Sequence, residues 1–213
     1  MTTASIAHSA PYISRVGINM RINIVGTAGS GKTTFSNTLA HHLGLSHIEL
    51  DALYWGPKWQ PLALPNFRKR VKQATAENHW IVDGNYRTKA RDIIWKRAQT
   101  VIWLDYPLPL VLWRLCQRSV TNIYSRRDLW ETGSRETLQK QFLSRDSFLL
   151  WAIKTHNPRR QRLAEAMQDD AYAHIDFVRL PSPFHAQMWL KQMAPQPQPA
   201  AWRSWARLDP ILG

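Results

Sequence analysis

A glycine-rich segment followed by lysine and threonine is the part of the sequence whose residue types and spacing most clearly suggest chemistry. The segment GTAGSGKTT fits the pattern G-x-x-x-x-G-K-[ST] at Gly26, Gly31, Lys32 and Thr33. Its glycines let the backbone curl so that successive N–H groups point inward, and such a concave row of donors binds phosphate oxygens. An apolar stretch precedes the segment and a helical pattern follows it, so the positive end of a helix dipole would add to the attraction.

The segment therefore predicts a binding site for a nucleoside triphosphate. Lys32 would reach the terminal phosphates and Thr33 would ligate Mg²⁺. We expect ATP as the nucleotide, and the sequence leaves GTP open. The residues expected to contact the nucleotide are Gly26, Thr27, Ala28, Gly29, Ser30, Gly31, Lys32, Thr33 and Thr34.

The carboxylate of Asp51, just after a predicted strand, is a second candidate for chemistry. A hydroxyl group that attacks phosphorus is helped by a carboxylate that orients it and takes its proton, whereas a monophosphate needs no such base. Asp51 therefore favours a hydroxyl acceptor, or a nucleoside whose sugar it would anchor. Trp55 and Trp59 could stack on a base. The structural alternative is that Asp51 caps a short helix and both tryptophans belong to the core.

Strands and helices alternate along the chain, and these elements must position the candidate residues. Continuous apolar strands separated by helices favour an α/β fold in which a parallel sheet is covered on both faces. Hydrophobic periodicity predicts strands at 21–25, 47–50, 80–83, 100–105 and 174–180, and helices at 32–43, 65–78, 109–118, about 159–168 and 183–192, with a further long helix that includes 138–153.

Length and composition indicate one domain. The chain has 213 residues, of which 44% are hydrophobic and 20% charged, as in ordinary globular proteins. No apolar run is long enough to span a membrane, and no signal-peptide pattern is present, so we expect a cytoplasmic protein, either a monomer or a homodimer. We expect residues 1–19 to form a disordered arm, 20–193 the domain with a lid at about 119–160, and 194–213 a flexible Pro/Gln-containing tail.

The chain is strongly basic, with a formal net charge of +13. This charge favours polyanionic partners, which are either nucleic acid or the phosphates of nucleotides. Basic residues outnumber acidic ones between residues 114 and 160 in particular. The sequence contains no recognisable helix-turn-helix, zinc or RNA-recognition motif, so composition alone does not choose between these partners.

The order of three motifs resembles the adenylate-kinase-like group of P-loop phosphotransferases. The phosphate loop is followed by VDGNYR, with Asp83 and Arg87, and then by RLCQR, with Arg114 and Arg118. The resemblance covers roughly residues 20 to 180. More narrowly, ELDALYWGPKW, WIVDGNY, VIWLDYP and SRRD are similar to small proteins named topology modulation proteins. The resemblance implies a three-layer P-loop NTPase fold, with a five-stranded parallel sheet in the order 2-3-1-4-5 and a helical, arginine-rich lid.

The resemblance also implies roles for two residues of the VDGNYR motif. Asp83 would hold Mg²⁺ through water, together with Thr33, and Arg87 would contact a phosphate or another anionic group of the acceptor. Asp105 also follows a strand, so it could take the metal role of Asp83, or it could cap the helix that Pro107 helps to start. The acceptor site would comprise Asp51, Trp55, Asp83 and Arg87.

Four arginines complete the implied catalytic machinery. Arg114 and Arg118 would lie against the triphosphate and stabilise charge on the transferred group. Arg126 and Arg127 would close over it from the lid and expel water. The residues expected to act in catalysis are thus Lys32, Asp51, Arg114, Arg118, Arg126 and Arg127.

Two departures from adenylate kinases argue against AMP as the acceptor. Asn85 and Tyr86 stand where that group has Phe-Pro, and ELDALYW replaces the pattern that binds nucleoside monophosphates.

Three functions follow from these observations. We favour an ATP-dependent phosphotransferase that acts on a nucleotide, a nucleoside or a similar small molecule. The alternative is a nucleic-acid-binding ATPase that modulates DNA topology, which rests on the net charge and on the name of the narrower group. A regulatory module without catalysis is the third, and the intact Lys32, Thr33 and Asp83 argue against it.

Overall fold

Five apolar segments form one parallel sheet with helices on both faces. The computed structural model describes residues 20–125 and 148–194. The strands are β1 (Met20–Gly26), β2 (His47–Glu49), β3 (His79–Asp83), β4 (Thr100–Leu104) and β5 (Asp176–Leu180). Their order is β2-β3-β1-β4-β5 and every neighbouring pair is parallel, which confirms the predicted three-layer fold and strand order.

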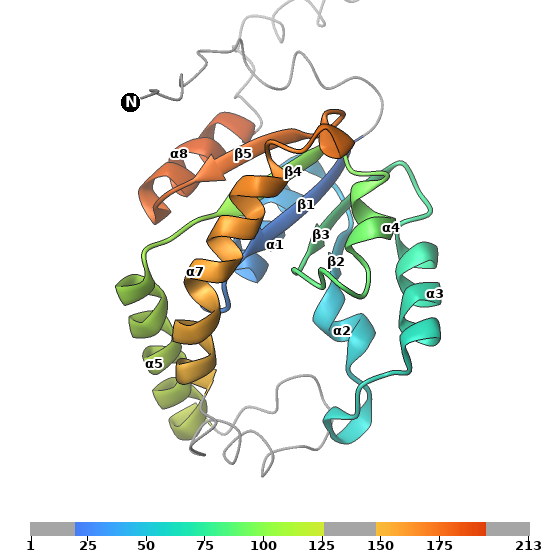
Figure 1. Ribbon diagram of the computed structural model, residues 1–213. Helices are drawn as coiled ribbons and strands as arrows, with labels where there is room; N and C mark the ends of the chain where they lie inside the picture. The colour runs from blue at the N-terminus through green and yellow to red at the C-terminus, as the bar shows by residue number, and fades with distance from the viewer. Residues whose placement is uncertain (1–19, 126–147, 195–213) are drawn as a thin grey trace, which may run out of the picture.

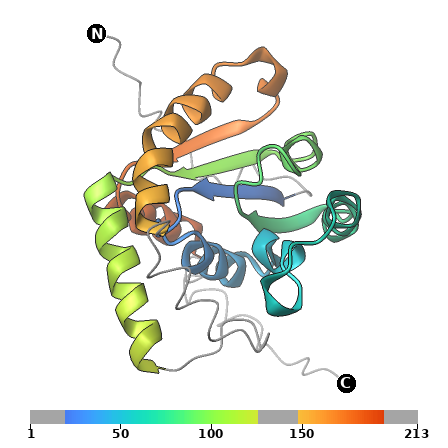
Figure 2. The same cartoon turned by 60° about the horizontal axis from the view of Figure 1, so that its bottom comes forward.

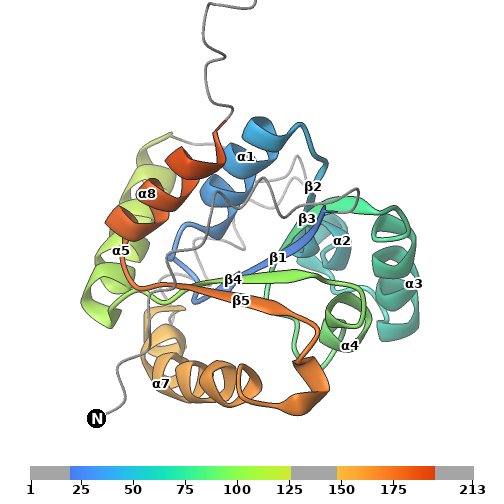
Figure 3. The same ribbon diagram turned by 90° about the horizontal axis from the view of Figure 1, so that it is seen from above.

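The helices connect these strands and cover the sheet. Helices α1 and α8 lie on one face, and α4 and α7 lie on the other (Figure 3). The helical elements are α1 (Lys32–Leu43), α2 (Leu50–Tyr54), α3 (Leu64–Ala74), α4 (Arg91–Trp95), α5 (Leu108–Ser125), α7 (Phe148–Ala166) and α8 (Pro183–Met193), with short 3₁₀ turns η2 (Pro57–Trp59) and η3 (Asp170–Tyr172) (Figure 1).

Alternating side chains of the central strand β1 supply both halves of the core. Ile22 and Ile24 pack with residues of α1, α5 and α8, whereas Val25 packs with residues of α3 and α4 on the opposite face. Asn23 shares the second face and is fully paired there. Its side-chain amide donates to the carbonyl of Val82 at 3.0 Å, and Trp95 Nε1–H donates to its carbonyl oxygen at 2.9 Å.

The register of the central strands brings the site residues to one edge. Ile24 lies opposite Asp83 in β3, and Gly26 lies opposite Leu104 in β4. The phosphate loop and Asp83 therefore meet where the strand order reverses, which is where open α/β sheets bind ligands.

Several element boundaries differ from the sequence prediction. The predicted break before residue 159 is absent, because α7 continues through Pro158, although proline leaves one intrahelical hydrogen bond unmade. Helix α5 extends to Ser125 and therefore includes the first residues of the predicted lid, and the short helix α4 was not predicted. The arm 1–19, the central part of the lid and the tail beyond 194 lie outside the described residues. Within the described ranges, no helix combines the length and apolarity needed to cross a membrane.

We predict that Asn23→Ala destabilises the fold, because it leaves the buried Trp95 N–H without its acceptor. The expected loss is about 1–3 kcal/mol in the free energy of unfolding, measured by chemical denaturation. The exposed Asn78→Ala is the control, with an expected change within about 0.5 kcal/mol. Equal stabilities of the two variants would contradict the structural role of Asn23.

Candidate functional site

The phosphate loop makes a tight connection between β1 and α1. Gly31 occupies the N-cap position of α1 with a φ of 85°, a left-handed conformation that glycine adopts without strain. Gly26 has no room for a side chain, since an added Cβ would lie 2.9 Å from the carbonyl oxygen of Leu104. At the start of α1, Lys32 Nζ donates to the carbonyl of Thr27 at 3.3 Å. The lysine is therefore folded back over the loop.

Asn85 holds the first glycine of this loop from the neighbouring strand. The N–H of Gly26 donates to Asn85 Oδ1 at 3.0 Å, and Asn85 Nδ2 donates to the carbonyl of Gly26 at 2.6 Å. These two hydrogen bonds continue the pairing of β1 with β3 beyond the end of β3. The sequence showed Asn85 only as a departure from adenylate kinases, because the contact spans 59 positions.

Lys32 lies between negative and positive side chains. Burial lowers the pKa of Lys32 below its usual value, and the positive charges of Arg159 and Arg118 act in the same direction. The carboxylates of Asp83 and Asp51 oppose this shift. The structure therefore brings two predicted carboxylates and one predicted arginine around the predicted lysine. It adds Arg159 of α7, which the sequence analysis did not single out.

Three polar side chains of β2 and β3 lie beside the phosphate loop: His47 begins β2, and Glu49 and Asp83 end β2 and β3. Asp83 is buried, and His47 Nε2 lies 3.3 Å from its Oδ2. Glu49 is the register partner of Asp83, and it accepts a hydrogen bond from the side chain of Thr33. Burial raises the pKa of Glu49 above the usual glutamate value, although that hydrogen bond opposes the shift. Glu49 was not predicted; its position in ELDALYW was the available signal.

These oxygens fit a magnesium ion. Mg²⁺ prefers hydroxyl, carboxylate and phosphate oxygens, and it keeps several waters instead of using an all-protein cage. Within the described ranges, no group of three or more His, Cys, Asp or Glu side chains is arranged to hold a metal ion. Thr33 and Asp83, with Glu49 beside them, supply the donor types required.

Asp51 and Tyr86 form a hydrogen-bonded pair on the acceptor side. Asp51 is exposed in the first turn of α2, after the cap position of Glu49, so it does not cap this helix. Tyr86 donates from its hydroxyl to Asp51 Oδ1 at 2.7 Å. Burial, together with the negative charge of Asp51, raises the pKa of Tyr86 far above its usual value. Tyr86 therefore remains a donor and leaves one oxygen of Asp51 for another partner.

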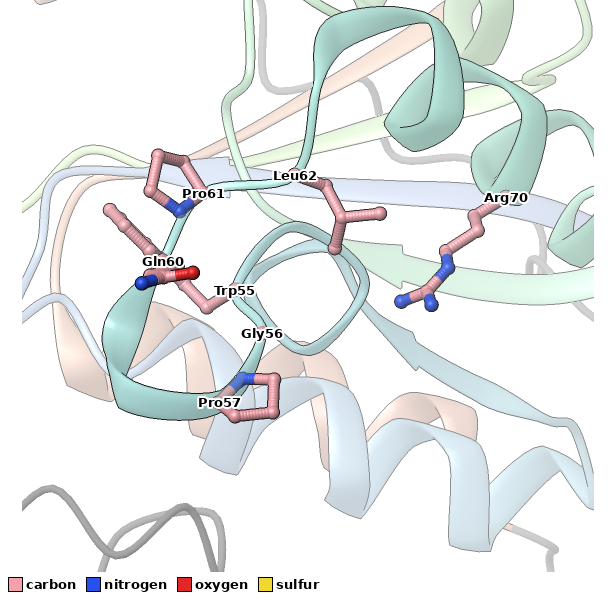
Figure 4. A pocket seen from close by; sticks show the side chains of 7 residues that line it. All are labelled: Trp55, Gly56, Pro57, Gln60, Pro61, Leu62 and Arg70. Atoms are coloured by element: carbon pink, nitrogen blue, oxygen red, sulfur yellow. The ribbon is translucent and has the colours of Figure 1, made fainter.

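Trp55 stands one helical turn beyond Asp51 and borders a pocket. It is half-buried, and its ring meets that of Trp59 edge-on with centroids 5.7 Å apart. The pocket has a volume of about 550 Å³. Figure 4 shows its lining: Trp55, Gly56, Pro57, Gln60, Pro61, Leu62 and Arg70. The lining combines apolar walls with one guanidinium group.

Two predicted arginines of α5 lie near the phosphate loop. Arg114 donates to the carbonyl of Ser30 at 3.2 Å, and its guanidinium lies 5.3 Å from the ring centroid of Tyr106. Arg118, one turn further along α5, is exposed and close enough for its charge to act on Lys32. Both arginines are therefore on the side of α5 near the phosphate loop, and their contact with a triphosphate stays a prediction.

The other three predicted arginines lie either at an exposed position or outside the described residues. Arg87 is exposed after β3. Arg126 and Arg127 lie outside the described residues, so their lid role stays a prediction.

Both expectations for Asp105 were wrong. Its carboxylate is buried and accepts hydrogen bonds from two arginines. Arg160 of α7 donates at 2.6 and 3.0 Å, and Arg179 of β5 donates at 2.8 and 2.6 Å. Because guanidinium groups occupy both oxygens, Asp105 neither ligates a metal nor caps α5.

Comparisons with known proteins show similarity of the chain to kinases. No family model matches the sequence. The chain is 30% identical over 110 residues to a shikimate kinase of Thermosynechococcus vestitus, and 28% identical over 112 residues to a cytidylate kinase of Pyrococcus horikoshii. Each alignment covers 46% of this chain, and they cover 58% and 56% of the relatives. The chain thus spans just over half the length of the curated relatives it matches.

A solved structure shows the fold. The crystal structure of a shikimate kinase from Bacteroides thetaiotaomicron superimposes with a TM-score of 0.51 at 12% identity, covering 83% of this chain and 97% of that one. The fold is that of P-loop kinases, and the sequence is similar to two of them. These comparisons do not confirm the narrower resemblance to topology modulation proteins, and they give no support to a nucleic-acid-binding ATPase.

We predict that Asn85→Ala weakens nucleotide binding by about tenfold, which corresponds to about 1.4 kcal/mol. The variant loses both hydrogen bonds that hold Gly26, so the phosphate loop is less ordered before the nucleotide binds. Part of the binding free energy then goes into ordering the loop, which raises the dissociation constant. Titration with ATP and Mg²⁺ in a calorimeter measures the change. Asn66→Ala, an exposed asparagine of α3, is the matched control. An unchanged dissociation constant in Asn85→Ala would rule out this role.

Proposed function

We propose that the chain is a phosphotransferase that moves the terminal phosphate of ATP to a hydroxyl group of a small molecule. One observation carries this proposal: the phosphate loop and Asp83 meet at one edge of the sheet, since Ile24 lies opposite Asp83 and Asn85 holds Gly26, and the next residue, Tyr86, holds Asp51. Groups suited to the donor phosphates are thus adjacent to a carboxylate suited to an acceptor. The names of the relatives, shikimate kinase and cytidylate kinase, support phosphoryl transfer to a small molecule.

On the donor side, the chain supplies positive charge and N–H groups. The backbone of the phosphate loop and Lys32 would bind the β- and γ-phosphates. Arg114, Arg118 and Arg159 would neutralise charge that spreads over the transferred group. Thr33 and Asp83 would hold Mg²⁺, which when bound neutralises phosphate charge.

On the acceptor side, Asp51 would act as the base. The free oxygen of Asp51 accepts the proton of the acceptor hydroxyl as the acceptor oxygen bonds to the γ-phosphorus. The bond from that phosphorus to the β–γ bridging oxygen breaks, and ADP leaves with the electron pair. Tyr86 fixes the second oxygen of Asp51 and so orients the base. A monophosphate would meet the negative charge of Asp51, which disfavours it relative to a hydroxyl.

The first test is a panel of acceptors. With ATP and Mg²⁺, we expect hydroxyl-bearing metabolites and nucleosides, but not nucleoside monophosphates, to stimulate ADP formation. Coupled detection of ADP measures this, and transfer of labelled phosphate identifies the product. Lys32→Met should abolish the stimulated rate because it removes the charge that holds the terminal phosphates. Stimulation by monophosphates alone would overturn the hydroxyl acceptor, and no stimulation by any compound would overturn the phosphotransferase.

The second test separates Asp51 from its partner. Asp51→Asn should lower kcat by about 10²–10⁴-fold, the range of general base catalysis, with little change in the KM for ATP. Tyr86→Phe should lower kcat by only about tenfold, since the base remains but loses a hydrogen bond. The exposed Asp176→Asn is the charge-matched control. If Asp51→Asn keeps the kcat of the control, Asp51 is not the base.

A further inference from the structure

The buried carboxylate of Asp105 joins three elements of the fold. It follows β4, and its two arginine partners come from α7 and β5. Its side chain is 1% exposed. A buried carboxylate is costly unless charged donors satisfy it, and here four charge-assisted hydrogen bonds do so. Such an arrangement has one geometry, so it fixes α7 relative to the sheet.

The anchored stretch of α7 faces the phosphate loop. His156 is buried, and its Nδ1 lies 3.4 Å from Thr27 Oγ1 of the loop. Arg160 is one turn further along the same face of the helix. Arg159, between them in sequence and half-buried, belongs to the same stretch of α7 that meets the loop through His156. Figure 2 shows α7 beside α5, the helix that carries Arg114 and Arg118.

A proline inside α7 makes the direction of the following turn dependent on contacts with the rest of the fold. Pro158 immediately precedes Arg159 and leaves one backbone hydrogen bond of the helix unmade. Helices kink at such positions. The direction of the turn that carries Arg159 therefore depends on tertiary contacts, and the bidentate pair of Arg160 with Asp105 is such a contact.

We propose that Asp105 and Arg160 are positioning residues for nucleotide binding: the ion pair between the buried Asp105 and the partly exposed Arg160 fixes the turn of α7 that holds Arg159 beside the phosphate loop. Arg160 therefore acts through Arg159 and not by touching the nucleotide. This inference rests on the proposed function only through ATP binding. It does not depend on the acceptor.

A double-mutant cycle on ATP affinity tests this role. Arg160→Gln should raise the dissociation constant of ATP by about tenfold, and Arg159→Ala should do the same. The double variant should bind within about twofold of Arg159→Ala, because once Arg159 is absent its positioning has no effect. Arg160→Gln leaves Asp105 paired with Arg179, so the fold is retained. Arg160→Lys, which keeps the charge but not the bidentate geometry, should show an intermediate loss.

Arg162→Gln is the matched control. It removes one positive charge from the same helix at an exposed position, so it shows how much of the effect is general electrostatics. A loss in Arg162→Gln equal to that in Arg160→Gln, or additive losses in the double variant, would overturn the positioning role while leaving the phosphotransferase intact. Absence of ATP binding by the wild-type chain would overturn both.

Discussion

Parallel pairing of β1 with β3 is the interaction on which the site depends. It sets Ile24 opposite Asp83, and two side-chain hydrogen bonds from Asn85 extend it to Gly26. Because side chains alternate along a strand, a slip by one residue would turn the wrong face of β3 toward each layer of the core. The buried packing of Trp80 and Val82 against one layer and Ile81 against the other prevents that slip. The core thus fixes the register, and the register fixes the site.

Three aspartates at the same edge of the sheet differ in burial and in their hydrogen-bond partners. Asp105 is enclosed by two guanidinium groups and has no free oxygen, so its contribution is structural. Asp83 is buried, and within residues 20–125 and 148–194 its side chain has a histidine, not a guanidinium group, at hydrogen-bond distance, an environment compatible with a hydrated cation. Asp51 is exposed and accepts a hydrogen bond from the neutral hydroxyl of Tyr86. Exposure and the charge of the partner, rather than residue type, separate the structural role of Asp105 from the metal-binding and base roles proposed for Asp83 and Asp51.

The sequence predicted the features that depend on local patterns. The phosphate loop and the five strands were accessible, because a glycine motif and apolar runs are contiguous in the chain, and the strand order followed from the resemblance to P-loop phosphotransferases. The roles of Asn85 and Asp105 were not accessible, since their partners are 55 to 74 residues away. A carboxylate after a strand looks the same in the sequence whether it faces a metal or two arginines. Proline also misled the prediction for α7, because packing of its buried residues outweighs one lost hydrogen bond.

Under the proposed function, the charges around Lys32 couple phosphoryl transfer to the choice of acceptor. A triphosphate would bring several negative charges, and Lys32 with Arg114, Arg118 and Arg159 offers positive charge on the side of the phosphate loop. Glu49, Asp83 and Asp51 place negative charge on the other side, which a divalent cation held by Asp83 would offset there but not near the exposed Asp51. An acceptor that carries its own phosphate would add to this excess, whereas a hydroxyl would add no charge and would give its proton to Asp51. The proposed hydroxyl acceptor is therefore the one that this asymmetry of charge favours.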